Sequence, residues 1–244
     1  MKAMVLAAGI GNRLRPLTDT CPKPMVPIAG RPLLEHVITL LRGHGFEQIA
    51  INVHHLPETV RDYFGDGSDW NVELTYSVEP NLLGTAGAVR KLAWYFTEPF
   101  LIYYGDHLSN VDITALRKAH ALTKCLATIG LIHRPEAGSS GIVELDSTRR
   151  VRRFVEKPTP EQIFEGFLVN AGIYVCEPEI TDWIKPGQMV DFGHDLFPLL
   201  LARGEHLMGH RLRGQLLATD TLERYQEAIS QVETGEFTLP PAGF

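Results

Sequence analysis

Strand and helix patterns alternate through the first 130 residues of the chain, and this alternation constrains the fold more than any other feature. Short apolar runs are separated by segments in which apolar residues recur at helical spacing. Such alternation predicts an α/β fold with a mostly parallel sheet and helices on both faces. The expected strands are residues 2–8, 49–53, 72–77, 100–104 and 126–132, and the expected helices are residues 32–42, 57–64, 85–96 and 112–124.

The pattern changes after Arg134. Strand patterns at about 141–146, 150–155 and 169–176 follow one another without long helices between them. We therefore expect a smaller, mixed lobe beside the parallel sheet. No Gly/Ser linker or internal repeat separates the two parts, so the sequence predicts one domain over 1–234. Its lobes would cover about 1–133 and about 134–234, and residues 235–244 would form a loose tail.

The composition excludes several classes of protein. Hydrophobic residues make up 44% of the chain and charged residues 21%, which is typical of a globular protein. The net charge of −6 argues against a nucleic-acid partner. The chain has no run of 18 apolar residues and no signal-peptide pattern, so we expect no membrane partner. Three widely spaced cysteines favour a reducing, cytoplasmic location.

The charge is unevenly distributed along the chain. Residues 1–31 contain five lysines or arginines, and Asp19 is their only acidic residue. A small cationic zone in an acidic protein indicates a local site for an anionic small molecule.

A glycine-rich turn follows the first expected strand, in the order Leu6-Ala7-Ala8-Gly9-Ile10-Gly11-Asn12-Arg13. Small residues in such a turn allow backbone N–H groups to approach a phosphate. The dinucleotide-binding fingerprint is excluded, because Leu14 replaces its third small residue and Pro16 opposes a helix there. The same two residues oppose an NAD-dependent oxidoreductase. The P-loop is excluded too, because the turn lacks Gly-Lys-Ser/Thr.

Lys23 stands between two prolines, ten residues after Arg13. The prolines hold this segment extended and stiff. A stiff lysine near a Gly/Arg turn is suited to clamp a chain of phosphates.

The turn belongs to a series of motifs that together resemble the sugar-phosphate nucleotidyltransferase family. The motifs are Leu6 to Thr18, Pro22-Lys23-Pro24 with Gly30-x-Pro32, Leu83 to Ala88, Gly105-Asp106, Glu156-Lys157-Pro158 and Asn170 to Tyr174. This family makes nucleotide sugars from a nucleoside triphosphate and a sugar 1-phosphate. The resemblance implies a Rossmann-like fold of the nucleotide-diphospho-sugar transferase type, these two substrates and an Mg²⁺ cofactor. A homo-oligomer is left open.

The resemblance also implies roles for individual residues. Arg13 would hold the β- and γ-phosphates, Lys23 would lie at the α-phosphate, and Asp106 would bind the metal. These three are the expected catalytic residues, and Arg15 would only shape the turn. The full nucleotide site would comprise Leu6, Ala8, Gly9, Gly11, Asn12, Arg13, Lys23, Glu79, Gly84, Thr85 and Asp106. No general base is needed, because a phosphate monoester has a second pKa of about 6 and is mostly ionised.

Asp106 ends an apolar strand, where ligands bind in open α/β folds, and carboxylates are suited to Mg²⁺. The second metal carboxylate departs from the family pattern, because Ala218 stands where many members carry Asp. We expect Asp220 to bind the metal instead, since residues 218 and 220 share a face in an extended strand. The departure leaves open a catalytically silent subunit that senses nucleotide sugars.

By the same resemblance, the sugar phosphate would lie against Gly141, Glu156, Lys157 and Asn170. Asp191 either caps the helix that carries residues 196–202 or touches the sugar, and we favour the cap.

The sequence favours guanylyl transfer from GTP to a mannose- or heptose-like 1-phosphate, because Glu79 could accept the N1–H and N2–H₂ groups of guanine. Cytidylyl or uridylyl transfer stays open, with glucose 1-phosphate or N-acetylmuramate 1-phosphate as the acceptor.

Overall fold

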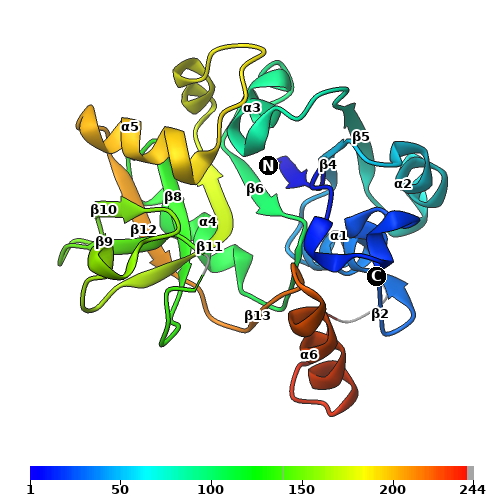
Figure 1. Cartoon of the computed structure of the whole chain (residues 1–244). Helices are drawn as coiled ribbons and strands as arrows, with labels where there is room; N and C mark the ends of the chain where they lie inside the picture. The colour runs from blue at the N-terminus through cyan, green and yellow to red at the C-terminus, as the bar shows by residue number, and fades with distance from the viewer. Residues whose placement is uncertain (139, 241–244) are drawn as a thin grey trace. The chain divides into compact units, whose positions relative to one another are not determined.

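The computed structural model describes residues 1–138 and 140–240, and the chain forms two compact units (Figure 1). Unit 1 comprises Met1–Leu82, Tyr103–Val111 and Gly214–Phe244. Unit 2 comprises Leu83–Ile102 and Asp112–Arg213. Each unit is therefore assembled from separate stretches of the chain, whereas the two lobes predicted from the sequence are continuous ranges.

Unit 1 contains a parallel sheet in the order β1-β4-β5, in which β1 and β4 are mostly buried. The strands are β1 (Ala3–Leu6), β4 (Gln48–Val53) and β5 (Glu73–Val78). Strand β6 (Phe100–Tyr104) ends in this unit, where Gly105 N–H donates to the carbonyl oxygen of Leu6 (2.9 Å). The residue after Gly105 is thereby held beside the carboxyl end of β1.

The first two α-helices of unit 1 form where the sequence predicts them. Helix α1 covers Leu33–Gly43 and helix α2 covers Pro57–Phe64. The apolar stripe expected in α1 is buried, from Leu33 through Val37 to Leu41. Helix α2 begins at Pro57, whose fixed φ suits the first turn of a helix.

The C-terminal part of unit 1 adds elements that were not predicted. Strands β7 (His107–Ser109) and β13 (Leu216–Ala218) pair antiparallel, and helix α6 (Leu222–Glu233) follows. The Thr221 hydroxyl caps α6 by accepting the N–H of Arg224 (3.3 Å). A short sheet, β2 (Pro27–Ile28) with β3 (Arg31–Pro32), completes the unit.

The expected tail is packed against unit 1 as far as it is described. Phe237 is 2% exposed and lies in a cluster with Leu14, Val26 and Leu108. Residues 235–240 are therefore held by an apolar side chain rather than loose. Residues 241–244 lie outside the described residues.

Unit 2 contains a mixed sheet. The long strand β11 (Leu168–Cys176) pairs antiparallel with both β8 (Ala127–Ile132) and β9 (Ile142–Leu145). Strand β10 (Val151–Val155) pairs antiparallel with β9, and β12 (Leu207–Arg211) pairs parallel with β8. The chain is thus an α/β protein with a mostly parallel part and a smaller antiparallel part, as the sequence predicts.

The α-helices described in unit 2 are α3 (Gly84–Lys91), α4 (Ile113–Ala121) and α5 (Phe197–Ala202). Asp112 caps α4 as predicted, with its carboxylate accepting the N–H of Ala115 (2.9 Å). Helix α3 is shorter than the predicted 85–96. After Lys91 the backbone bonds connect residues three apart, because Phe96 turns to stack on Phe100 (ring centroids 4.1 Å apart).

In the described ranges, no helix has the length and apolarity that crossing a membrane requires.

Candidate active site

The glycine-rich turn is packed against the segment that carries Lys23. Gly11 has a φ of 75°, a conformation that favours glycine. A Cβ at Gly11 would lie 2.9 Å from Thr18 Cγ2 and 3.1 Å from Lys23 Cβ. The Thr18 hydroxyl donates to the Gly11 carbonyl oxygen (2.8 Å). Gly11 is required here both for its backbone conformation and for this close approach.

Lys23 and Asp106 form an ion pair, with Lys23 Nζ 2.7 Å from Asp106 Oδ2. The Lys23 side chain is only 11% exposed. Burial acts to raise the pKa of Asp106, but the charges of Lys23 and His107 and the hydrogen bond from Lys23 lower that pKa below its ordinary value. Asp106 is therefore a carboxylate at neutral pH and holds the Lys23 ammonium in place.

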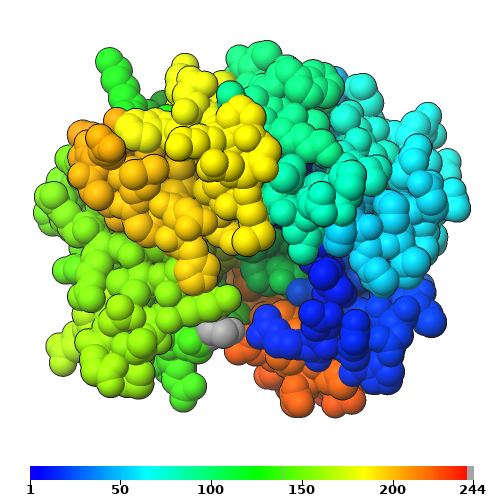
Figure 2. All heavy atoms as spheres, turned by 45° about the horizontal axis from the view of Figure 1, so that its top comes forward, coloured from blue at the N-terminus to red at the C-terminus, as the bar shows by residue number. Residues whose placement is uncertain are grey.

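Asp220 forms a second cluster of charges, with Arg13 at 2.7 Å and Arg224 at 3.0 Å. Burial acts to raise the pKa of Asp220, and the hydrogen bond from Arg224 and the charge of Arg13 lower it below the ordinary value. The side chain of Arg13 is 62% exposed. In Figure 2 the N-terminal segment, in blue, lies at the surface next to the C-terminal segment, in orange.

The pairing of β7 with β13 brings the two clusters together. Ala218 pairs with His107, and the Thr219 N–H and hydroxyl both donate to the carbonyl oxygen of Asp106 (3.2 and 3.0 Å). The expectation that 218 and 220 share a strand face is wrong, because β13 ends at Ala218. Asp220 lies instead in the turn before α6, and the strand pairing places it near Asp106.

These carboxylates fit a magnesium ion. Asp106 Oδ1 is buried and accepts no hydrogen bond from the described residues, although His107 Nε2 lies 3.4 Å away. An ionised oxygen without a donor is suited to a hard cation. The described residues contain no group of three or more His, Cys, Asp or Glu side chains arranged to hold a metal. The remaining ligands would be phosphate oxygens and water, as is usual for Mg²⁺.

Glu79 is part of a hydrogen-bond chain inside unit 1. Asn52 Nδ2 donates to Glu79 Oε1 (2.8 Å), and Asn52 Oδ1 accepts the N–H of Ala7 (2.8 Å). The chain connects Glu79 to the end of β1, where Leu6 and Ala8 lie. One carboxylate oxygen of Glu79 is thus engaged with Asn52, and its role in reading guanine stays a prediction.

In unit 2, the predicted residues Gly84 and Thr85 form the start of α3. Gly84 has a φ of 71°, and a Cβ there would lie 2.5 Å from the Val190 carbonyl oxygen. That oxygen accepts the N–H groups of Ala86 and Gly87 (2.9 and 3.1 Å). Gly84 therefore allows the segment around Val190 to pack directly on the N-terminus of α3.

Asp191 caps α3 rather than the helix that follows it in the chain. Its Oδ1 accepts both the N–H and the hydroxyl of Thr85 (3.0 Å each). The sequence-based assignment of Asp191 to its own helix is wrong, because its side chain caps no N–H there. Its own N–H donates instead to Asp195 (2.7 Å).

The predicted sugar-phosphate residues come together in unit 2. Glu156 Oε2 lies between two glycines, where a Cβ at Gly141 or Gly193 would come within 2.5 or 2.4 Å of it. The N–H of Asn170 donates to the Gly141 carbonyl oxygen (2.8 Å). Burial raises the pKa of Glu156, although His194 and Lys157 oppose the shift. Gly193 was missed, because only its contact with Glu156, far away in the sequence, reveals it.

The predicted site residues thus fall into two groups. Arg13, Lys23, Asp106 and Asp220 meet in unit 1, and Gly141, Glu156 and Asn170 meet in unit 2. Lys157 follows Glu156 with a φ of 46° and is exposed.

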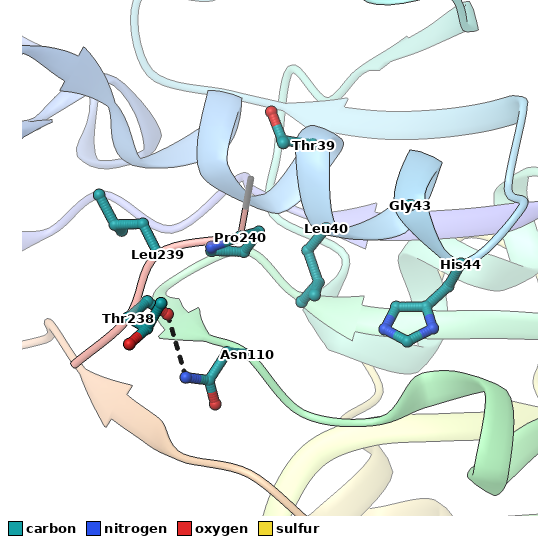
Figure 3. Close-up of a pocket in the computed structure, with 8 residues that line it drawn as sticks. All are labelled: Thr39, Leu40, Gly43, His44, Asn110, Thr238, Leu239 and Pro240. Atoms are coloured by element: carbon teal, nitrogen blue, oxygen red, sulfur yellow. Dashed lines mark hydrogen bonds between the residues drawn. The ribbon is translucent and has the colours of Figure 1, made fainter. Parts of the chain in front are cut away.

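A separate pocket of about 480 Å³ lies in unit 1 between the end of α1 and residues 238–240 (Figure 3). Asn110 Nδ2 donates to the Thr238 carbonyl oxygen at its edge (3.1 Å). None of the predicted site residues lines it.

Comparison with known proteins agrees with the motifs. The chain is 41% identical over 218 residues to UTP-glucose-1-phosphate uridylyltransferase of Synechocystis sp. (84% of this chain, 56% of the relative). It is 35% identical to mannose-1-phosphate guanylyltransferase of Mycobacterium tuberculosis (83% and 56%). It is 36% identical to N-acetylmuramate alpha-1-phosphate uridylyltransferase of Neisseria meningitidis serogroup B (93% and 96%). The chain therefore spans about half the length of the first two relatives and nearly all of the third.

The crystal structure of apo UDP-glucose pyrophosphorylase shares the fold, with a TM-score of 0.81 at 19% identity, covering 97% of this chain and 100% of that one. The family described as Nucleotidyl transferase matches residues 2–234. The chain therefore belongs to the nucleotidyl transferase family.

Proposed function

We propose that the protein transfers a nucleoside monophosphate from a nucleoside triphosphate to a sugar 1-phosphate and releases pyrophosphate. The observation that carries the proposal is the pair of neighbouring ion pairs in unit 1, Lys23–Asp106 and Arg13–Asp220, each 2.7 Å long. The names of the three relatives support it, because each is a sugar-1-phosphate uridylyl- or guanylyltransferase.

The main difficulty of this reaction is to bring two polyanions together. The attacking phosphate oxygen is already ionised at neutral pH, so the protein must chiefly position the substrates and neutralise charge. Lys23 is held rigidly by Asp106 and would lie at the α-phosphate, where attack occurs. Arg13 is more exposed and would hold the β- and γ-phosphates, which leave as pyrophosphate.

Asp106 and Asp220 would hold Mg²⁺, which supplies further positive charge to the phosphates when it is bound. In the structure these carboxylates are paired with Lys23 and Arg13. The pairing with these cations lowers the pKa of both carboxylates, so both would be ionised as metal ligands must be.

The sugar phosphate would bind in unit 2. The Glu156 carboxylate would accept hydrogen bonds from sugar hydroxyls, and Lys157 would hold the phosphate. Gly141 and Gly193 leave room for the carboxylate, since side chains there would displace it. Asn170 would contact the sugar beside Gly141, to which its backbone is hydrogen-bonded.

For the donor base, we propose GTP with a mannose- or heptose-like 1-phosphate, on the strength of the Glu79 carboxylate and the guanylyltransferase relative. UTP is the second candidate donor. The relative at 41% identity and the one that covers 93% of the chain are both named as uridylyltransferases. Glucose 1-phosphate and N-acetylmuramate 1-phosphate are the corresponding acceptors.

The test is pyrophosphate release from each of GTP, UTP, CTP and ATP with each candidate sugar 1-phosphate. Two arginine variants make the test specific, because the Arg13 and Arg15 side chains are equally exposed (62%) and each is paired with an aspartate. We expect Arg13→Ala to lower kcat/KM by about 100-fold or more, as loss of a charge-stabilising donor does. Arg15→Ala should stay within about twofold of the parent protein, since exposed ion pairs contribute little.

Equal effects of the two substitutions would refute the role of Arg13. Triphosphate binding without pyrophosphate release for any pair of substrates would favour the silent sensing subunit instead.

A further inference from the structure

A second cluster of reactive groups lies in unit 2, apart from the residues assigned to the transferase site. It consists of His120 near the end of α4, Cys125 in the following loop, Thr128 on β8 and Glu177 directly after β11. The His120 Nε2 atom lies 3.3 Å from Glu177 Oε1. The His120 Nδ1 atom lies 3.6 Å from Cys125 Sγ and 2.9 Å from Thr128 Oγ1.

The three groups lie in the order carboxylate, imidazole, thiol. The Nε2 atom makes no hydrogen bond of good geometry with the described residues, but the negative charge of the neighbouring Glu177 carboxylate favours the tautomer that carries its proton on Nε2. Nδ1 is then an acceptor and faces the Cys125 thiol. A proton that moves from Sγ to Nδ1 would leave a thiolate beside an imidazolium, and the imidazolium would be stabilised by Glu177.

Hydroxyl groups around the sulfur complete the arrangement. Thr123 Oγ1 lies 3.0 Å and Thr128 Oγ1 lies 3.3 Å from Cys125 Sγ. The Thr128 hydroxyl donates to His120 Nδ1 while that atom is an acceptor, and it is released to donate to the sulfur once Nδ1 takes the thiol proton. The Thr123 hydroxyl donates to the His120 carbonyl oxygen (2.9 Å) and would have to turn from it to reach a thiolate. Burial acts to raise the pKa of Cys125, but the hydrogen bonds from His120, Thr123 and Thr128 lower it below the ordinary value. Burial raises the pKa of Cys21, and burial together with the charges of Cys125 and Glu177 raises the pKa of Cys176.

The cluster lies just under the surface. Cys125 is 4% exposed, but Leu122 at the start of its loop is 87% exposed. The 4% exposure of Cys125 restricts any reagent that reaches the sulfur to one of a few atoms. The titratable groups that act on the sulfur are His120 from α4 and Cys176 at the end of β11. Glu177 acts on His120 and Cys176, and Lys124 beside the sulfur is exposed.

We propose that Cys125 is a modification site, at which a thiolate paired with His120 reacts with small hydroperoxides. The thiolate attacks one peroxide oxygen, the S–O bond forms and the O–O bond breaks. The sulfur is oxidised by two electrons to a sulfenic acid, and the peroxide is reduced. The leaving hydroxide or alkoxide takes the proton from the imidazolium and departs as water or an alcohol.

The test uses the intact protein and compares two of its own thiols. Cys21 is more exposed than Cys125 but has no imidazole beside it, and its thiol donates to the Pro22 carbonyl oxygen (3.6 Å). Exposure alone therefore predicts a faster reaction at Cys21. The contact of Cys125 with His120 predicts a faster reaction at Cys125. The protein is treated at pH 6.5 with limiting iodoacetamide, or with hydrogen peroxide followed by dimedone, and labelling of each cysteine is followed by peptide mass spectrometry.

We expect Cys125 to react at least about tenfold faster than Cys21 at pH 6.5, because an ordinary thiol of pKa about 8.5 is only about 1% ionised there. The rate at Cys125 should level off at a lower pH than the rate at Cys21, because the pKa of Cys125 is lowered and that of Cys21 is raised. Cys125 reacting no faster than Cys21 would overturn the proposal.

Glu177→Gln is the matched variant, since Glu177 is partly exposed and the substitution keeps the side-chain shape. We expect the midpoint of the Cys125 pH profile to move upward while the Cys21 profile is unchanged. A Cys125 midpoint that stays in place would show that Glu177 and His120 do not activate the thiol. Circular dichroism of the variant confirms that the comparison is made on folded protein.

Discussion

Replacing Asp191 by alanine should destabilise unit 2 by removing the cap of a helix that is distant in the sequence. The Asp191 carboxylate accepts the N–H and the hydroxyl of Thr85, both at 3.0 Å. Loss of an N-cap costs about 1–2 kcal/mol, and a hydrogen bond to a charged group contributes about 1.5–3 kcal/mol. Because Thr85 is only half buried, water replaces part of the lost hydrogen bonding in the variant. We therefore expect the free energy of unfolding to fall by about 2 kcal/mol.

Urea denaturation followed by circular dichroism at 222 nm measures this loss. A change of 1 kcal/mol corresponds to about 2–4 °C in Tm for domains of this size, so thermal unfolding should shift downward by about 4–8 °C. Asp191→Asn keeps one oxygen acceptor, so its free energy of unfolding should fall by less than half as much as that of Asp191→Ala. Asp182→Ala is the control, because Asp182 also contacts α3, through Arg90 at 3.9 Å, but is 77% exposed.

A free energy of unfolding for Asp191→Ala within about 0.5 kcal/mol of the parent protein would refute the capping role. So would an Asp182→Ala loss as large as that of Asp191→Ala.

Three further outcomes are expected. Gly193→Ala places a Cβ 2.4 Å from Glu156 Oε2 and should displace the carboxylate. The KM for the sugar 1-phosphate should then rise by about tenfold or more, while the KM for the triphosphate stays unchanged. Equal rises in both KM values would contradict the role of Glu156 in binding the sugar. The pKa of Asp106 is lower in the folded protein, so its stabilisation is present above the ordinary aspartate pKa and lost as pH falls through the folded value. The difference in urea stability between the parent and Asp106→Asn should therefore shrink below about pH 4, and a difference independent of pH between 3 and 6 would contradict this. Chelation by EDTA should abolish pyrophosphate release and added Mg²⁺ should restore it, whereas full activity in EDTA would exclude the metal.

The long elements of the fold could be predicted because their signals are local. Helix α2 and strand β6 have the predicted bounds, since Pro57 and the continuous run Phe100–Tyr104 define them within a few residues. Strands β7 and β13 have three residues each, too few for a period, and only their pairing stabilises them. Helix α6 did carry a local signal in the Thr221 cap, but comparison with a family motif favoured an extended strand there.

The chemistry of the candidate site could be predicted further than its contacts. Residue type and spacing predict that Arg13 and Lys23 are cations near a turn suited to phosphate. They do not reveal that Asp220 pairs with Arg13, because the two residues are brought together by tertiary structure. The incorrect assignment of Asp191 as the cap of its own helix has the same cause. A capping residue is normally sought just before its own helix, and Asp191 caps a helix that begins 107 residues earlier.

The segment from Val190 to Gly193 connects two predicted subsites within unit 2. The Val190 carbonyl oxygen and the Asp191 carboxylate hold the start of α3, where the predicted nucleotide residues Gly84 and Thr85 lie. Gly193, two residues later, closes against the Glu156 carboxylate of the predicted sugar subsite. A Cβ at Gly193 would come within 2.4 Å of the Glu156 carboxylate, and a Cβ at Gly84 within 2.5 Å of the Val190 carbonyl oxygen, so glycine is required at both contacts. Because the two contacts are close together on one packed segment, we expect a substitution at Gly193 to disturb the cap of α3 as well.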